Sequence, residues 1–425
     1  MTALHSEHEF DAIVVGSGPA GATVARELSK KKKRVLILER GGNEPLKEGL
    51  LATASILNTV PVGEKLATTR AFTTGGTSSV YFGVANDPPL ELFRSLGADL
   101  STYLDEARKE LPLAVLPDNL LGAQAVRVRD SAMKLGLPWV KNQMLIDQAK
   151  CSSGYAAAAK WNARRYVNEA VEAGAALISR AAVLKVLIDR NRAIGVEYKL
   201  HKGKKDYEVR QAFGTRVILS AGGTASALIL RESGMRNVAK DGFYIHPCFA
   251  VFGIVPGLKA GPNFVGSAEA RIDGNINIGD GNFDRVFYRM FMLGEGKIIR
   301  AFRHARSIGV GVMVKESLGG ELREDGSFHK QLKDEDFYKL EKGAELARQI
   351  IVNAGGRNLY RSSLTASHLG GLIQMKSHLD DSLQTECSNL HICDGSVVPE
   401  TVMEAPSLTL ICLGKYLANR LAPAL

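Results

Sequence analysis

The feature that most constrains the fold is a glycine motif that lies between two apolar runs near the N-terminus. Residues 11–15, DAIVV, form a β-branched run typical of a buried parallel strand. GSGPAG follows directly, then a helical pattern over residues 22–32, and then a second apolar run, RVLILE, that ends at Glu39. This order predicts a strand–helix–strand unit that binds a dinucleotide.

Each glycine of the motif has a mechanical purpose. Gly16 allows a sharp turn, Gly18 removes a side chain where backbone must approach a pyrophosphate, and Gly21 lets helix and strand pack closely. The N-terminus of the helix then offers free N–H groups to the phosphates. Glu39 lies eighteen residues beyond Gly21, near the distance at which a carboxylate binds the ribose hydroxyls. The alternative is an incidental glycine turn, and the motif alone does not separate FAD from NAD.

Length and cysteine usage set the broad class of the protein. The 425 residues, 45% of them hydrophobic, allow two or three domains. The N-terminal MTALHSEHEF lacks the basic and apolar regions of a signal peptide, and no run approaches the roughly 20 apolar residues of a spanning helix. The five cysteines are scattered and contain no CxxC pair. We therefore expect a reduced, cytoplasmic chain without a metal site.

The charge balance is basic, at +9 with a pI near 9.2. A basic surface attracts acidic substrates, acidic proteins or anionic lipid, and the plainer interpretation is a solvated surface with no dedicated partner. The densest run, residues 30–34, falls where the first helix should end and would complement its dipole. No aromatic residues interleave with it, so we predict no nucleic-acid site, whereas peripheral membrane contact stays open.

The rest of the chain has its own pattern. Residues 176–222 predict a strand, a three-stranded meander and then a buried strand, VILSA. Residues 223–385 are less regular and form the candidate substrate domain, in which 333–353 predicts a helix pair or one long amphipathic helix. Near the C-terminus, APSLTLICLGKYLANRL predicts a helix with Pro406 near its first position, where proline is favoured.

Five segments, in order, carry a resemblance to a known family. They are GSGPAG with ERGG at 39–42, GGTSS at 75–79, SAGGTASALILRESG at 220–234, HLGGLIQM at 368–375, and DGSVVPE…APSLT within 394–409. In that order and at those separations they resemble the glucose–methanol–choline (GMC) oxidoreductases. The resemblance runs from about residue 10 to the C-terminus. The chain is shorter than most members, so its substrate domain looks trimmed.

The resemblance implies an α/β fold with two parts. One is a Rossmann-like parallel sheet with a β-meander, which binds FAD across a discontinuous domain of residues 1–90, 170–240 and 385–425. The other is an antiparallel-sheet substrate domain, formed with cap regions by residues 91–169 and 241–384. The isoalloxazine ring is then expected at the boundary between the two.

The same resemblance implies the cofactor contacts. GGTSS would lie along the flavin, the Val183 backbone would meet the adenine, and Asp394 would reach the ribitol and pyrophosphate. A helix that starts near Pro406 would point its positive end at the flavin N1 and C2 carbonyl. Residues 70–85 contain neither His nor Cys, so the FAD is expected to be non-covalent. The implied cofactor-binding residues are Gly16, Ser17, Gly18, Pro19, Ala20, Gly21, Glu39, Arg40, Gly75, Gly76, Thr77, Ser78, Ser79, Val183, Ala221, Gly222, Asp394, Gly395, Ala405, Pro406, Ser407 and Leu408.

The implied catalytic base is His368. Its spacing to Gly371 and Met375 fits the family's HxxGT-like motif with a following Met. A histidine titrates near neutrality, so it can accept an alcohol proton while hydride leaves to flavin N5. The plainer interpretation is a satisfied core or surface histidine.

The chain departs from the family at the second catalytic position. Most members have His or Asn where this chain has Ala405, which Glu404 precedes. Either Glu404 substitutes, or His368 acts alone, or the chemistry differs. The segment that begins at Ser220 also lacks the proline usual in that signature.

We therefore expect an FAD-dependent alcohol dehydrogenase or oxidase that acts on a small-molecule substrate, which the basic charge allows to be acidic. A non-redox lyase on the same scaffold and a flavin-holding subunit without activity are the alternatives. The electron acceptor stays open between oxygen, a quinone and a protein.

Overall fold

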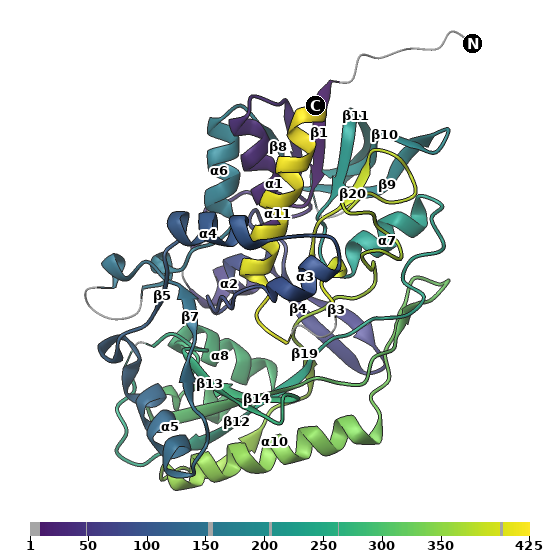
Figure 1. The fold of residues 1–425 in the computed structure, drawn as a ribbon. Helices are drawn as coiled ribbons and strands as arrows, with labels where there is room; N and C mark the ends of the chain where they lie inside the picture. Colours follow the sequence, from purple (N-terminus) through teal and green to yellow (C-terminus); the bar gives the residue numbers. More distant parts are fainter. Residues whose placement is uncertain (1–8, 48, 152–155, 204–205, 262, 400–402) are drawn as a thin grey trace.

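The computed structural model describes residues 9–47, 49–151, 156–203, 206–261, 263–399 and 403–425. The first eight residues, where we expect no signal peptide, and residues 400–402 of the last motif lie outside the described part. Two seven-stranded sheets organise the chain, one above the other in Figure 1.

The first sheet has the strand order β8-β2-β1-β11-β10-β9, and β20 pairs with β11. β1, β2, β8 and β20 run parallel to their neighbours, whereas β9, β10 and the first half of β11 form an antiparallel meander. Its strands are β1 (Phe10–Val15), β2 (Val35–Leu38), β8 (Ala176–Ile178), β9 (Ala181–Asp189), β10 (Arg192–His201), β11 (Tyr207–Leu219) and β20 (Leu390–Ile392). The third meander strand and the buried VILSA strand, expected as two elements, are thus one continuous strand, β11.

Helices α1 (Pro19–Lys30), α4 (Ser101–Glu110), α6 (Arg164–Glu172) and α11 (Ser407–Leu421) lie beside this sheet (Figure 1). Helix α11 packs closely on α1, because a Cβ at Gly414 would stand 2.8 Å from the Ala20 carbonyl oxygen. The buried Nζ of Lys415 pairs with Glu106 of α4 at 3.2 Å and Glu110 at 3.0 Å. These contacts hold the C-terminal helix against the strand–helix–strand unit.

The second sheet is antiparallel, with the order β18-β12-β15-β14-β13-β6, and β19 pairs with β12. Its strands are β6 (Val140–Lys141), β12 (Pro247–Ile254), β13 (Ala268–Ile272), β14 (Ile276–Asp280), β15 (Ser307–Val314), β18 (Arg357–Arg361) and β19 (Thr365–Ala366). One helix, α10 (Asp334–Asn353), packs on it together with α5 (Gly122–Lys134). The segment expected as a helix pair or one helix is therefore a single helix.

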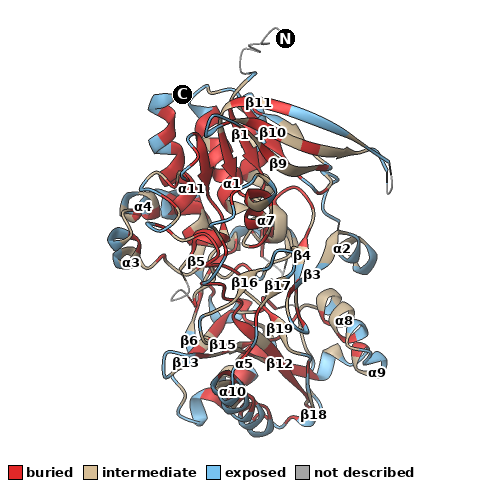
Figure 2. Cartoon of the chain, turned by 90° about the vertical axis from the view of Figure 1, so that its right-hand side faces the viewer, coloured by how far each residue is buried: buried red, intermediate tan, exposed pale blue. Residues whose placement is uncertain are grey.

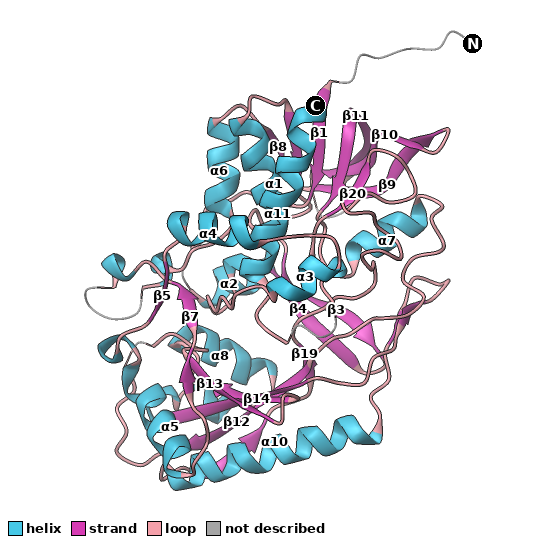
Figure 3. Cartoon of the chain, viewed as in Figure 1, coloured by secondary structure: helices cyan, strands magenta, loops and turns pink. Residues whose placement is uncertain are grey.

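Loops and short elements fill the space between the sheets (Figure 3). The remaining helices and strands are α2 (Leu50–Ile56), β3 (Leu57–Gly63), β4 (Leu66–Ala71), α3 (Leu90–Ser95), β5 (Leu113–Val115), β7 (Gln143–Leu145), α7 (Ala225–Glu232), α8 (Arg285–Gly294), α9 (Ile298–Ala301), β16 (Glu321–Leu322) and β17 (Phe328–His329). The 3-10 turns are 76–79, 118–120, 148–150, 157–159, 304–306, 395–397 and 422–424. The expected α/β class with parallel and antiparallel sheets is confirmed.

Burial follows the two sheets, whose strands and facing helices form the buried core (Figure 2). Across the described ranges, none of the helices has the length and apolar character needed to cross a bilayer.

Candidate active site

The glycine motif has the geometry that a dinucleotide site requires. Gly16 adopts φ +99°, and a Cβ there would stand 2.3 Å from the Ser220 carbonyl oxygen. A Cβ at Gly21 would stand 2.2 Å from the Gly16 oxygen, so helix and strand meet at glycine. At Gly18, by contrast, a Cβ would meet no described atom within 4 Å. Gly16 and Gly21 are needed for packing, whereas Gly18 borders open space at the N-terminus of α1.

Glu39 ends β2 beside this motif, with 5% of its surface exposed. Its carboxylate accepts hydrogen bonds from the backbone N–H of Ser17 at 3.1 Å, the Ser17 hydroxyl at 2.5 Å and the Gly41 N–H at 2.7 Å. Burial raises the pKa of Glu39, and these three donors oppose that effect. The acid is therefore fixed at the edge of the glycine loop.

Residues 75–79, of which the last four form a 3-10 turn, lie directly against the glycine loop. The Gly75 N–H donates to the Ser17 hydroxyl at 3.0 Å, and a Cβ at Gly76 would stand 3.3 Å from the Gly18 Cα. The buried Ser78 hydroxyl accepts from the Ala163 N–H at 2.9 Å, which fixes the turn. Thr77 and Ser79 lie on the same turn and are half-buried. Two motifs that are about 60 residues apart in sequence thus share one wall of the site.

Asp394 joins the end of β20 to the turn after β11. One carboxylate oxygen accepts from the Gly222 N–H at 2.9 Å and from the Ser226 hydroxyl, and the other accepts from the Ser396 N–H at 2.9 Å. Ala221 lies close to Gly16, since a Cβ at Gly16 would stand 3.1 Å from the Ala221 Cα. Asp394 is therefore engaged in holding the backbone of the site together.

His368 enters the site from the segment that follows β19. The next residues lie against the Asp394 turn, because a Cβ at Gly370 would stand 2.6 Å from the Gly395 oxygen. The His368 Nδ1 is buried and has no hydrogen-bond partner among the described residues, while the whole residue remains partly exposed. Burial lowers the pKa of His368 to about 4, with a contribution from the Arg70 cation. The imidazole is thus neutral at physiological pH and can accept a proton.

Two residues near His368 were not predicted from the sequence. Arg70 on β4 donates to the Ser367 carbonyl at 3.1 Å, forms no ion pair with any described carboxylate, and has a pKa lowered to about 10 by burial. His246 is fully buried, and its ring centroid lies 5.8 Å from that of His368 in an edge-to-face arrangement. Neither residue belongs to a sequence motif. Arg70 lies on β4 and His246 directly precedes β12, and the fold of these two segments places both residues near His368.

The segment before α11 carries the unusual second position. The Glu404 carboxylate pairs with Arg271 of β13 in the second sheet. The Ala405 N–H donates to the Asn86 side-chain oxygen at 3.1 Å, and Ala405 contributes no polar side chain. Pro406 precedes the first residue of α11, Ser407, and Leu408 is fully buried. Glu404 is therefore engaged with a cation.

The remaining predicted residues lie near Glu39 and at the start of α1. Val183 is half-buried on β9, two residues beyond Ala181, whose N–H donates to the Glu39 carbonyl at 2.8 Å. The Arg40 guanidinium stacks 3.7 Å from the Phe72 ring centroid. Pro19 is the first residue of α1, and Ala20 is buried. The structure thus brings the five sequence motifs to one edge of the first sheet.

Comparison with known proteins gives the relationships of the chain. A family model described as GMC oxidoreductase matches residues 10–248. An uncharacterized GMC-type oxidoreductase of Mycobacterium tuberculosis (strain H37Rv) is 30% identical over 275 residues, which are 57% of this chain and 42% of that protein. A sinalpyl alcohol oxidase of Nesocodon mauritianus is 27% identical over 257 residues, which are 54% of this chain and 45% of the oxidase.

Among solved structures, pyridoxine 4-oxidase from Mesorbium loti superimposes with a TM-score of 0.72 at 15% identity. That match covers 97% of this chain and 99% of the oxidase, so the two share a fold over nearly their whole length. The chain spans less than half the length of both curated relatives described above.

Proposed function

We propose, since this chain belongs to the GMC oxidoreductase family, that it binds FAD non-covalently and oxidises a CH–OH donor. The observation that carries the proposal is the placement of His368, which lies partly exposed beside the Asp394 turn and whose Nδ1 has no hydrogen-bond partner among the described residues. The sinalpyl alcohol oxidase relative supports an alcohol as the donor. When bound, FAD supplies the hydride acceptor of this reaction.

The residues fit FAD. The open side of Gly18 and the N-terminus of α1 would take the pyrophosphate, and Glu39 would take the ribose hydroxyls. The turn at 75–79 would lie along the flavin, and the N-terminus of α11 would stabilise negative charge that develops there. The other contacts proposed from sequence, among them Val183 and Asp394, lie along the same edge of the first sheet.

His368 would act as the proton acceptor. Because its pKa is about 4, the imidazole holds no proton near neutral pH and its nitrogen is available to the alcohol proton, although the same low pKa makes it a weak base. The cation of Arg70, which no described carboxylate neutralises, would favour an anionic group in the same space. This supports an alcohol that carries a carboxylate or a similar acid as the substrate, which is consistent with the basic charge of the chain.

We consider two candidates for the second catalytic residue, Glu404 and His246. Glu404 can substitute for the family's His or Asn only if it leaves Arg271, with which it pairs. His368 can instead act with the neighbouring His246, whose ring lies edge-to-face against it. A non-redox or inactive flavoprotein is the second candidate function, and the observation that favours it is the apolar Ala405 at this position.

The test is anaerobic bleaching of the purified yellow protein. Neutral alcohols and hydroxy acids of matched size are mixed with the protein, and flavin absorbance is followed. Bleaching by an alcohol supports the proposal, and a hydroxy acid is expected to bleach faster than its uncharged analogue. If no alcohol bleaches a protein whose flavin dithionite reduces normally, the non-redox or inactive candidate takes its place. Acid precipitation tests the linkage, because non-covalent FAD leaves the pellet colourless.

The cellular compartment and the electron acceptor are proposed separately. The five cysteines are free, which supports a reducing compartment such as the cytoplasm. A screen of oxygen, soluble quinones and redox proteins on the substrate-reduced protein would identify the acceptor.

A further inference from the structure

One face of the molecule combines exposed apolar side chains with cations. The apolar part comes from three neighbouring segments, which are α2, the end of α8, and α9 with the residue that follows it. The exposed residues are Leu51 at 84%, Leu293 at 41%, Ile298 at 64%, Ile299 at 72% and Phe302 at 71%. In Figure 2, α2, α8 and α9 lie together along one edge, and α9 is largely exposed. We call these five residues the apolar face.

The stretch that contains α8 and α9 is strongly basic. Residues 285–306 contain six cations and a single acid. That acid, Glu295, is half-buried and accepts hydrogen bonds from the Ser363 N–H at 2.9 Å and from the Tyr360 hydroxyl. The six cations, none of which forms an ion pair with a carboxylate in the described part of the chain, are Arg285, Arg289, Lys297, Arg300, Arg303 and Arg306. Arg289 and Arg300 are half-buried, and Arg300 donates to the Asn358 carbonyl. The other four cations are exposed, so positive charge is left for an external partner.

Apolar residues and cations occupy the same surface. Leu50 of α2 lines a cavity with Arg285, Val286 and Arg289 of α8, so the two helices adjoin there. The Arg289 guanidinium lies 5.7 Å from the centroid of the Phe302 ring, which connects α8 to the end of α9. Tyr288 and Met292 form the buried side of α8, while Arg285 is exposed and Arg289 is half-buried against the Phe302 ring.

From these observations we infer that this face docks on an anionic lipid bilayer. Aliphatic side chains that protrude from a four-residue helix enter the interface between headgroups and acyl chains, and arginines around them meet lipid phosphates. A soluble polyanion would use the cations but would leave Ile298 and Ile299 without a matching apolar surface. The lipid bilayer satisfies both components.

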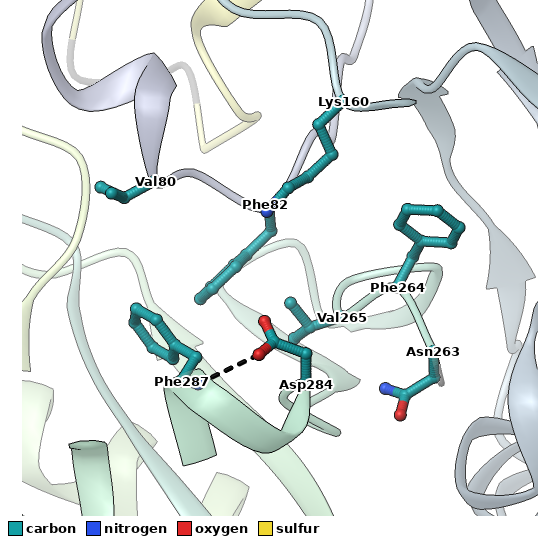
Figure 4. A pocket seen from close by; sticks show the side chains of 8 residues that line it. All are labelled: Val80, Phe82, Lys160, Asn263, Phe264, Val265, Asp284 and Phe287. Carbon is teal, nitrogen blue, oxygen red and sulfur yellow. Dashed lines mark hydrogen bonds between the residues drawn. The ribbon is translucent and has the colours of Figure 1, made fainter. Parts of the chain in front are cut away.

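The docking face is close to the candidate active site. Phe287 of α8 and Phe82 approach each other edge-to-face with centroids 5.8 Å apart, and Phe82 follows the 75–79 turn by three residues. Figure 4 shows the two rings pointing toward one another around a small pocket that Val80 and Val265 also line. Docking would therefore bring this side of the site to the bilayer surface.

The test is co-sedimentation of the purified full chain with vesicles, with protein measured on gels so that the result is independent of flavin chemistry. Vesicles of phosphatidylcholine alone are compared with vesicles that also contain phosphatidylglycerol. We expect binding to the anionic vesicles only. Ile298→Ser with Ile299→Ser and Phe302→Ser, and separately Arg285→Gln with Arg303→Gln, should each weaken binding by about tenfold or more.

The control pair is Tyr338→Ser with Val352→Ser on α10, because these side chains are 70% and 56% exposed on a different face. It should bind like the wild type. Failure of the wild type to sediment with either vesicle overturns the inference. Binding that the arginine pair abolishes but the apolar triple leaves unchanged also overturns it, since that result describes a purely electrostatic surface for a soluble polyanion. Thermal melting of every variant checks that the fold is intact.

Discussion

The hydroxyl of Ser17 lies 2.5 Å from the carboxylate of Glu39, which joins the glycine loop to the end of β2. The same hydroxyl accepts the Gly75 N–H at 3.0 Å. One serine therefore connects the acid expected to bind ribose with the turn expected to lie along the flavin. The three segments form a single unit, and a change in one is expected to affect cofactor binding by the others.

Glu39→Gln should weaken FAD binding by about 10–100-fold. All three groups that contact the Glu39 carboxylate are donors, so an amide N–H₂ faces a donor and the charge is lost. Hydrogen bonds to a charged group contribute about 1.5–3 kcal/mol, which corresponds to that range. Flavin retained after dialysis is the measurement. Glu44→Gln, an exposed acid that pairs with Arg180, is the matched control. Full retention of flavin by the Glu39→Gln variant would make Glu39 a strand-end residue only.

Gly414→Ala and Gly294→Ala should have opposite effects on the free energy of unfolding. A Cβ at Gly414 stands 2.7 Å from the Thr23 Cβ and 2.8 Å from the Ala20 oxygen, so overpacking should cost about 1–3 kcal/mol. At Gly294, the last residue of α8, a Cβ meets no described atom within 4 Å. Alanine there should stabilise the helix by about 0.5–1 kcal/mol. Urea midpoints of the two variants test the pair, and a shift of equal sign contradicts it.

The first sheet was well predicted, because short sequence patterns mark its strands and turns. The strand–helix–strand unit follows from an apolar period and from glycines that the packing requires, as the contacts at Gly16 and Gly21 show. The continuity of β11 was missed, because a meander strand and a buried strand differ in apolar pattern although the backbone is uninterrupted. No local sequence signal marks the point at which β11 stops pairing with β10 and begins to pair with β1.

The surroundings of His368 were only partly predictable. Its motif was visible, but the low pKa depends on burial and on Arg70, which lies 298 positions earlier in the chain. The ion pair of Glu404 with Arg271 is likewise tertiary, since β13 belongs to the second sheet. Contacts between sheets depend on the complete fold, and single-sequence patterns carry no information about them.

His368→Ala should lower the rate of flavin reduction by about 10²–10⁴-fold, the usual contribution of a positioned base. Flavin content should not change, because Glu39, Gly18 and the 75–79 turn would hold the cofactor elsewhere. Stopped-flow reduction with a donor that bleaches the wild type is the measurement. His201→Ala, on the distant meander strand β10, should reduce at the wild-type rate. An unaffected His368→Ala variant would place the catalytic side of the flavin elsewhere.

Glu404→Gln distinguishes the two candidates for the second catalytic residue. If Glu404 only pairs with Arg271, the amide keeps a hydrogen bond and the reduction rate should fall by no more than about fivefold, because partly exposed ion pairs contribute about 0–1 kcal/mol. If Glu404 takes part in the chemistry, the loss should approach that of His368→Ala. Ala405→Asn adds a polar group beside the substrate, so in the first case it should leave the rate steady or raise it. Rates for all three variants with one donor decide between the candidates.

Removal of the Arg70 charge should move the pH profile of flavin reduction. As the proposed base, His368 would act in its neutral form, so the wild-type rate should be constant near neutrality and fall as the pH drops through about 4. Arg70 contributes to that low pKa, and Arg70→Met should therefore move the limb to higher pH, whereas Arg70→Lys should keep it close to the wild-type position. The Arg70→Met variant should also lose more rate with a hydroxy acid than with a neutral alcohol of the same size. An unmoved limb in that variant would show that burial alone keeps His368 neutral, and equal losses with both donors would remove Arg70 from substrate recognition.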